Sequence, residues 1–185
     1  MLPPAILWID PGGQTGLAYL TIAGQQEGYK FGAEEKPFQD ACRFIDMWCQ
    51  GYRDQLAIGW ERFTVTRNTH KLTPQPEAMH VIGVCRYLAA RYGCRVLPEA
   101  QQASPGQLEQ KELKALGWWV PSKNDAQSAA SHLLRWLRQS GELPPREREI
   151  LDALGRQEKE DGDSQNDYPH HAGRGSEQLP SQTRR

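Results

Sequence analysis

A run of apolar residues that ends in one carboxylate and a glycine-rich turn is the feature that most constrains the fold. Residues 6–9 are apolar, Asp10 follows them, and Pro11-Gly12-Gly13 comes next. Such a run is typical of an interior strand, and paired glycines allow the positive φ that a tight reversal needs. The pattern therefore predicts that Asp10 is presented at a strand end. A plain Asp-Pro-Gly turn without chemistry explains this segment equally well.

Length and composition favour a single folded domain followed by a polar tail. The chain has 185 residues and 38% hydrophobic content, which suits one domain. Residues 1–150 carry the apolar patterns, whereas 151–185 are mainly charged residues, Gly, Pro and His, and are expected to be disordered. We find no run long enough to cross a bilayer and no basic segment followed by a long apolar one, so we expect a cytoplasmic protein.

Charge and cysteine usage exclude some classes of function. The formal net charge of −1 provides no overall attraction to nucleic acid, so such binding would depend on a local basic face or on metal ions. The four cysteines lack the C-x-x-C spacing of zinc sites and lie inside apolar patterns. We therefore expect free, buried thiols.

Periodicity predicts alternating strands and helices along residues 5–140. Strand-like segments at 16–22 and 29–33 suggest an antiparallel hairpin after the first strand, and 56–60 is a further buried strand. A short strand is expected at 95–97. Helical spacing begins at Pro37, Pro76, Pro105 and Asp125, with Asn124 or Asp125 suited to the N-cap of the last helix. The helix after Pro76 is expected to end at Gly93.

Three acids come at points where such elements begin or end. Asp10 and Glu61 each follow a buried strand, and Asp125 begins the last helix. If the first and fourth strands are neighbours, Asp10 and Glu61 share one sheet edge, and Asp125 can close the cluster. Carboxylates so close repel unless a cation lies between them, and Mg²⁺ or Mn²⁺ prefers such oxygen ligands. Alternatively, Glu61 is a surface acid and Asp125 a helix cap.

These residues resemble the RuvC-type Holliday junction resolvases of the RNase H-like superfamily, in particular the short phage and actinobacterial proteins. Ile9-Asp10-Pro11-Gly12-Gly13 with Thr15-Gly16 is similar to the first motif of that family, and Trp60-Glu61-Arg62-Phe63 is similar to the second. The stretches 73–93 and 125–134 are similar to the helices that follow. The resemblance covers residues 5 to 140.

The resemblance implies an RNase H-like α/β fold, with a mixed five-stranded sheet whose first three strands are antiparallel and with helices on both faces. It also implies a metal-dependent endonuclease for branched DNA, in which Asp10, Glu61 and Asp125 hold two Mg²⁺ ions that Mn²⁺ can replace. DNA contacts are expected from Gly13, Thr15, Arg62, Arg67 and Lys71. Family members usually act as dimers, and the apolar stripe of residues 78–89 is either such an interface or core.

The sequence departs from the family in the last helix. The family places two metal-site residues three positions apart there, and this chain offers either Asp125 with Ser128 or Ser122 with Asp125. Both alignments keep Asp125 and weaken one ligand. Ser128 and His132 are assigned supporting roles, and a partly buried structural histidine is the alternative for His132.

Two other functions compete with this interpretation. The missing fourth ligand suggests an inactive RNase H-like scaffold that binds DNA or a protein without cutting. The Asp-Pro-Gly-Gly-Gln-Thr-Gly segment also resembles the first phosphate loop of actin-like and sugar-kinase-like ATP-binding proteins. Those folds need a second such domain and a second phosphate motif that we do not find, so ATP is not an expected ligand.

Overall fold

A five-stranded mixed sheet forms the centre of the protein. The structure is a computed structural model that describes residues 2–22, 29–63, 76–100 and 105–165, with only the helical backbone for 158–165. The strands are β1 (Ala5–Asp10), β2 (Gln14–Ile22), β3 (Tyr29–Pro37), β4 (Leu56–Trp60) and β5 (Arg95–Val96), in the order β3-β2-β1-β4-β5. β1 pairs antiparallel with β2 and β2 antiparallel with β3, whereas β1 pairs parallel with β4 and β4 parallel with β5. This arrangement confirms the predicted sheet.

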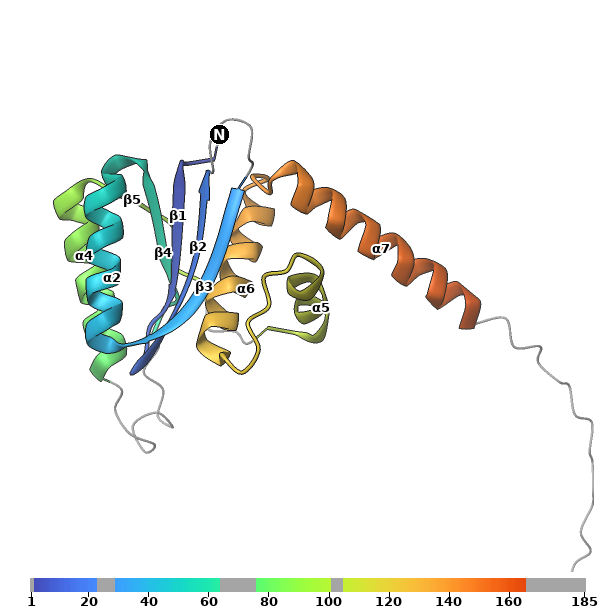
Figure 1. Ribbon diagram of the computed structural model, residues 1–185, viewed down its shortest axis with the longest axis horizontal. Coiled ribbons are helices and arrows are strands. Elements are labelled where there is room, and N and C mark those ends of the chain that lie inside the picture. Colours follow the sequence, from blue (N-terminus) through green and yellow to red (C-terminus); the bar gives the residue numbers. More distant parts are fainter. Residues whose placement is uncertain (1, 23–28, 64–75, 101–104, 166–185) are drawn as a thin grey trace, which may run out of the picture.

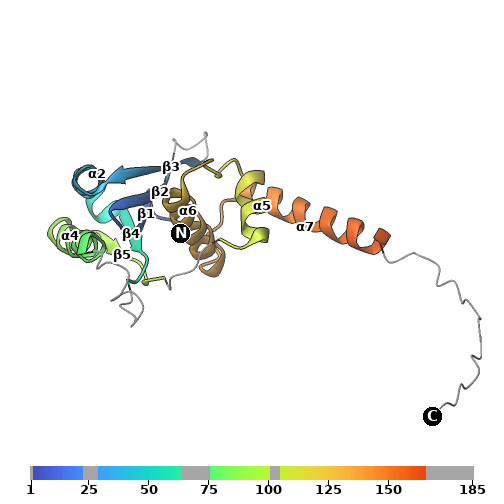
Figure 2. The same ribbon diagram turned by 90° about the horizontal axis from the view of Figure 1, so that it is seen from below.

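Helices cover both faces of the sheet (Figures 1 and 2). α2 (Phe38–Tyr52) and α4 (Pro76–Tyr92) pack on one face, and the 3₁₀ turn η1 (Arg53–Gln55) leads from α2 into β4. α6 (Asn124–Gln139) crosses the other face over β1, β2 and β3. α5 (Gln107–Ala115) packs beside α6, and α7 (Pro145–Gln165) extends away from the body. No helix in the described ranges is long and apolar enough to cross a membrane.

The alternation of side chains along each strand decides which residues face which helices. Leu7 and Ile9 of β1 belong to the core beneath α2 and α4, whereas Ile6 and Trp8 belong to the core beneath α6. Since successive residues point to opposite faces, Asp10 follows Trp8 onto the α6 side. The same alternation in β4 puts Ala57, and with it Glu61, on that side. Both acids therefore face α6.

The apolar stripe of α4 is core. Its buried residues pack with Ile45, Trp48 and Cys49 of α2 and with the odd-numbered positions of β1. Of the two alternatives left open for residues 78–89, the core assignment is confirmed, because these side chains are already covered by the sheet and α2. The helix ends as predicted: Gly93 has a φ of 75° and the Cys94 N–H donates to the Ala89 carbonyl oxygen at 2.9 Å.

All four cysteines are free, as predicted; Cys49, Cys85 and Cys94 are buried and Cys42 is half-buried. Burial raises the pKa of each thiol.

The expectation of disorder from residue 151 is wrong for 151–165, because α7 continues through this segment. Leu151 packs against the core beneath α6, which ties the start of α7 to the body.

The Trp8 ring of β1 occupies the space beside Gly59 of β4. A Cβ added there would lie 2.6 Å from Cζ3 of the buried Trp8 ring. We expect Gly59→Ala to lower the free energy of unfolding by about 1–3 kcal/mol through overpacking. Urea unfolding followed by tryptophan fluorescence measures this change. The matched control is Gly51→Ala in α2, where an added Cβ meets nothing within 4 Å, and which we expect to be neutral or slightly stabilising.

Candidate metal and nucleic-acid site

Asp10 and Glu61 lie side by side where β1 and β4 end. The Glu61 N–H donates to the Ile9 carbonyl oxygen at 3.0 Å, which extends the parallel pairing of β1 with β4 by one residue. The expectation that the first and fourth strands are neighbours is confirmed. Asp125, in the first turn of α6, faces this edge from the helix layer.

The three acids line one cavity of about 540 Å³ at this end of the sheet. Its walls come from the turn after β1, the segment after β4, the start of α5 and the first turns of α6. The lining residues are Asp10, Pro11, Gly12, Gly13, Gln14, Glu61, Arg62, Phe63, Pro105, Gln110, Asn124, Asp125, Gln127 and Ser128. Most carry polar side chains, as a site for a charged ligand requires.

The electrostatics of the cavity favour a bound cation. Burial, the charge of Glu61 and the charge of Asp125 raise the pKa of Asp10 to about 8, against the effect of a hydrogen bond with Ser128 that lowers it. Burial, Glu35 and Glu61 likewise raise the pKa of Asp125. Negative charge is thus gathered where little water can screen it, and a cation would relieve the repulsion.

The donor set fits a hard divalent ion. Carboxylate and hydroxyl oxygens are the ligands that Mg²⁺ and Mn²⁺ prefer, and Asp10, Asp125 and Ser128 offer them within one cavity. Within the described residues, no three His, Cys, Asp or Glu side chains already form a group that could hold a metal ion.

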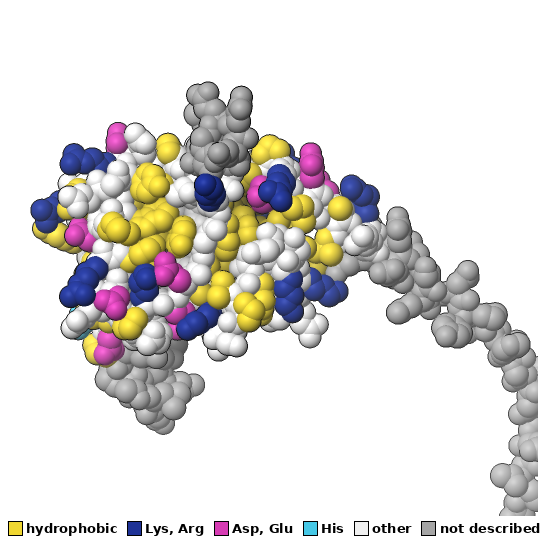
Figure 3. Space-filling view, viewed as in Figure 1, with side chains coloured by type: hydrophobic (Ala, Val, Ile, Leu, Met, Phe, Trp, Pro, Cys, Tyr) yellow, Lys and Arg dark blue, Asp and Glu magenta, His cyan; other side chains and the backbone are white. Residues whose placement is uncertain are grey.

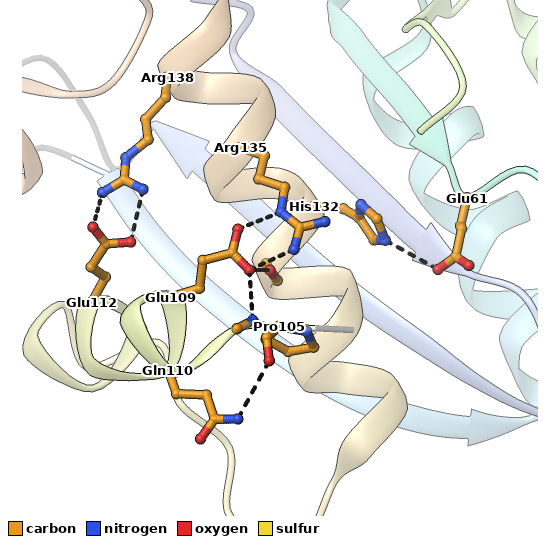
Figure 4. Close-up of polar contacts among 10 residues, drawn as sticks. Glu61, Pro105, Glu109, Gln110, Glu112, His132, Arg135 and Arg138 are labelled. Atoms are coloured by element: carbon orange, nitrogen blue, oxygen red, sulfur yellow. Dashed lines mark hydrogen bonds and ion pairs between the residues drawn. The ribbon is translucent and has the colours of Figure 1, made fainter. Parts of the chain in front are cut away.

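His132 is a buried partner of Glu61. Its Nε2 lies 3.1 Å from Glu61 Oε2, and the two residues are only 2% and 6% exposed (Figure 4). The imidazole also stacks on the indole of Trp8, with ring centroids 6.2 Å apart and planes at 19°. Two turns of α6 separate His132 from Asp125, so one helix carries both to the sheet edge. This contact is compatible with the supporting role and shows that the histidine is part of the core as well.

Ser128 and Ser122 differ in their relation to the cavity. Ser128 lines it one turn after Asp125, whereas Ser122 lies before α6 with a φ of 59° and is not part of the cavity wall. Of the two alignments left open, the geometry favours Asp125 with Ser128.

The residues predicted to contact nucleic acid differ in their exposure to solvent. Gly13 and Arg62 are exposed and line the cavity. Thr15 is fully buried and its hydroxyl donates to the Gly12 carbonyl oxygen at 2.9 Å, which corrects its assignment to DNA contact: it holds the turn together. Arg67 and Lys71 lie outside the described residues.

The turn at Gly12 and Gly13 differs from the prediction in its backbone conformation. Among the described residues the glycines with positive φ are Gly93, Gly117 and Gly141, so the predicted positive φ at Gly12 and Gly13 is wrong. Gly12 is needed for space instead: an added Cβ would lie 2.6 Å from the Gln14 carbonyl oxygen. The turn is also tied to α2, since the Phe38 N–H donates to the Gly13 carbonyl oxygen at 3.2 Å.

The first turn of α6 is capped from the sheet. Glu35 Oε1 of β3 accepts hydrogen bonds from the N–H groups of Asp125 at 3.0 Å and Ala126 at 3.5 Å. The prediction that Asn124 or Asp125 is the N-cap is wrong: Lys123 occupies that position without a side-chain cap. Sequence reasoning missed Glu35 because 90 residues separate it from Asp125, although its place on the α6 face of β3 follows from strand alternation.

Two ion pairs hold α5 against α6. Glu109 pairs with Arg135, and Glu112 Oε2 accepts from Arg138 Nη1 at 2.7 Å (Figure 4). Ser131 adds a hydrogen bond to Glu109 Oε2 at 2.9 Å. These contacts place Pro105 and Gln110 in the cavity wall. The basic side chains Arg135 and Arg138 therefore serve the packing of the domain.

Comparisons with known proteins match the fold. No protein-family model and no curated protein sequence matches the chain. Among solved structures it is similar to T. thermophilus RuvC in complex with a Holliday junction substrate, with a TM-score of 0.50 and 12% identity over 75% of this chain and 96% of that one. RNase H1 from the halophilic archaeon Halobacterium salinarum NRC-1 matches with a TM-score of 0.31 and 8% identity, over 53% of this chain and 86% of that one. The strand order and the likeness to RuvC show an RNase H-like α/β fold, as predicted.

The raised pKa of Asp10 predicts a pH-dependent effect on stability. Because the folded state retains a proton that the unfolded chain releases from about pH 4 upward, Asp10 destabilises the metal-free protein increasingly up to about pH 8. We expect Asp10→Asn to melt at a higher temperature than the wild type at pH 9 in EDTA, with a smaller difference in melting temperature at pH 5. At pH 9 the variant should gain on the order of a few kcal/mol in free energy of unfolding. Thermal melts followed by circular dichroism measure both differences. Asp54→Asn in η1 is the control; equal differences at the two pH values would contradict the proposed charge cluster.

Proposed function

We propose that this protein is a divalent-metal-dependent endonuclease that hydrolyses phosphodiester bonds in branched DNA. The observation that carries the proposal is the convergence of Asp10, Glu61 and Asp125 on one polar cavity, where burial, together with the charges of Glu61 and Asp125, raises the pKa of Asp10 to about 8. Buried structural acids are usually paired with basic groups. Glu61 has such a partner in His132, whereas the charges that act on Asp10 and Asp125 are those of other carboxylates. A site of this kind is suited to binding cations and, through them, phosphate.

Asp10, Glu61 and Asp125 are the proposed ligands of Mg²⁺, with Mn²⁺ as a substitute and two ions per site. Such ions, when bound, polarise a scissile phosphate and lower the pKa of a water nucleophile. The chain itself contributes rigidity. Asp10 and Glu61 are held by the paired ends of β1 and β4, and His132 restrains the Glu61 carboxylate through the 3.1 Å contact. Ser128 lines the cavity together with Asp10.

Among the described residues, few basic groups lie near the cavity that DNA would have to reach. Arg62 is exposed at its wall, Lys123 is half-exposed before α6, and the backbone of the glycine turn is accessible at Gly13. On the face in Figure 3, Lys and Arg side chains are interspersed with Asp and Glu. Phosphate binding should therefore depend on local contacts and on metal ions, which suits recognition of DNA shape better than of base sequence.

Branched DNA is proposed as the substrate from the motif resemblance, and RuvC, which shares the fold, was solved with a Holliday junction. Cleavage of two symmetric strands would require a homodimer, which we also propose. Its interface must use residues other than the buried stripe of α4.

A non-cleaving DNA-binding scaffold is the second candidate. It is favoured by Ser128, a hydroxyl in place of a further carboxylate, and by the absence of a ready-made metal cluster within the described residues. This candidate shares the fold and the surface but not the chemistry, so a cleavage assay separates the two.

Asp10→Asn should abolish cleavage. The exchange is nearly isosteric but removes charge from the site, so we expect a loss of activity of at least about 100-fold with the fold retained. Labelled four-way junctions, duplexes and single strands are incubated with the wild type and the variant in Mg²⁺, in Mn²⁺ and in EDTA.

Asp54→Asn is the matched control for that assay, because it makes the same exchange just before β4 begins, at the end of the strands opposite to Asp10. We expect it to cut like the wild type. Undiminished cleavage by Asp10→Asn would contradict the mechanism. Junction binding without any product in the wild type would favour the scaffold.

Arg62→Ala should weaken DNA binding without abolishing it. One lost phosphate contact is expected to lower the slope of log K against log salt by about 1, uniformly across sequences. Fluorescence anisotropy with a labelled junction at several salt concentrations measures this slope, with Ca²⁺ in place of Mg²⁺. Arg95→Ala, on exposed β5 away from the cavity, is the control. An unchanged slope in Arg62→Ala would exclude this residue from the DNA contact.

A further inference from the structure

Glu35 has both carboxylate oxygens directed at the start of α6. Oε1 accepts from the N–H groups of Asp125 and Ala126, and Oε2 lies 3.6 Å from Lys123 Nζ. The side chain is only 13% exposed, whereas that of Lys123 is 52% exposed. A largely buried carboxylate of β3 thus binds the residues on which the third acid of the cavity is mounted.

Glu35 belongs to a row of positions that crosses four strands. Sheet pairing aligns Glu35 of β3 with Gly16 of β2, and Gly16 with Asp10 of β1. Glu61 continues the row beyond β4, because it follows Trp60, the partner of Ile9. Paired residues of neighbouring strands share a face, so this row lies on the α6 side.

Gly16 is the position in that row that has no side chain. A Cβ at this position would collide with the carbonyl group of Asp125 and would lie 2.8 Å from the Ala126 nitrogen. The backbone of the first turn of α6 therefore rests directly on β2, between Glu35 on one side and Asp10 on the other. The helix can approach this closely only because residue 16 has no side chain.

The cap from β3 leaves the side chains of α6 available. The first N–H groups of a helix need acceptors, and a carboxylate also interacts favourably with the helix dipole there. Asn124 or Asp125 could have served as a local cap, as their residue types favour. Because Glu35 takes this role from another element, the Asp125 carboxylate remains at the cavity, at the cost of a second negative charge beside it.

We propose that Glu35 is a positioning residue, which holds Asp125 at the place relative to Asp10 that cation binding needs. Gly16 contributes by letting the first turn of α6 contact β2. The inference rests on the proposed function, since it assigns a role in the same metal site. It differs from ordinary helix capping in its consequence. A cap stabilises the helix, whereas a positioning residue also determines the affinity of the site for the ion.

The test measures binding of Mn²⁺ alone, by electron paramagnetic resonance, at a temperature where each variant is folded. Glu35→Ala removes the acceptor and should weaken Mn²⁺ binding by about 10- to 100-fold, as for other partners that orient metal ligands. Glu35→Gln keeps an acceptor oxygen and should retain most of the affinity. Glu34→Ala is the matched control: it lies next along β3 and pairs with Lys36 at 2.6 Å. It should bind like the wild type.

Amide hydrogen exchange at Asp125 and Ala126 reports the cap itself. We expect faster exchange there in Glu35→Ala and wild-type protection in Glu35→Gln. If Glu35→Ala does not fold, Glu35→Asp, which shortens the side chain by one methylene, carries the same expectation of weaker Mn²⁺ binding.

Three results would overturn the inference. The first is faster exchange with unchanged Mn²⁺ affinity in Glu35→Ala, which would leave Glu35 as a helix cap only. The second is a loss of affinity in Glu35→Gln as large as in Glu35→Ala, since charge and not geometry would then matter. The third is an absence of Mn²⁺ binding in the wild type, which would reject the metal site itself and is recognised without any variant of Glu35.

Discussion

The parallel pairing of β1 with β4 is the contact on which the rest of the site depends. β1 is enclosed by β2 and β4 and contributes to the cores on both faces, so its register cannot slip by one residue without turning Trp8 and Asp10 to the wrong side. This register puts Glu61 next to Asp10, and strand alternation directs both toward α6. The positions of the acids are thus consequences of core packing.

Packing also accounts for the unusual electrostatics. Burying one carboxylate is costly, and burying it beside others is more so, which the raised pKa of Asp10 reflects. The domain tolerates this cluster because the surrounding structure is firmly held. Trp8 and Ala57 fill the core beneath α6, and the ion pairs of Glu109 with Arg135 and Glu112 with Arg138 hold α5 to α6. Under the proposed function, a bound cation would relieve the repulsion among these acids.

Much of the fold could be predicted because its signals are local. The apolar run before Asp10, the stripe of α4 and the glycine at position 93 each determine a strand, a helix or a helix end within a few residues. The N-cap of α6 could not be predicted in this way, since its acceptor is on β3. The role of Thr15 was missed for a similar reason: only the folded turn brings its hydroxyl to the Gly12 carbonyl oxygen.

The sequence by itself determined the order of the elements through α6 and the placement of Asp10 and Glu61 at strand ends. These depend on periodicity and turn chemistry, which act between near neighbours in the chain. Only the tertiary structure decided that Ser128 and not Ser122 joins Asp125 at the cavity, that His132 contacts Glu61, and that Glu35 binds the start of α6. Those contacts join residues on different elements, and their distances follow from how the helix settles on the sheet.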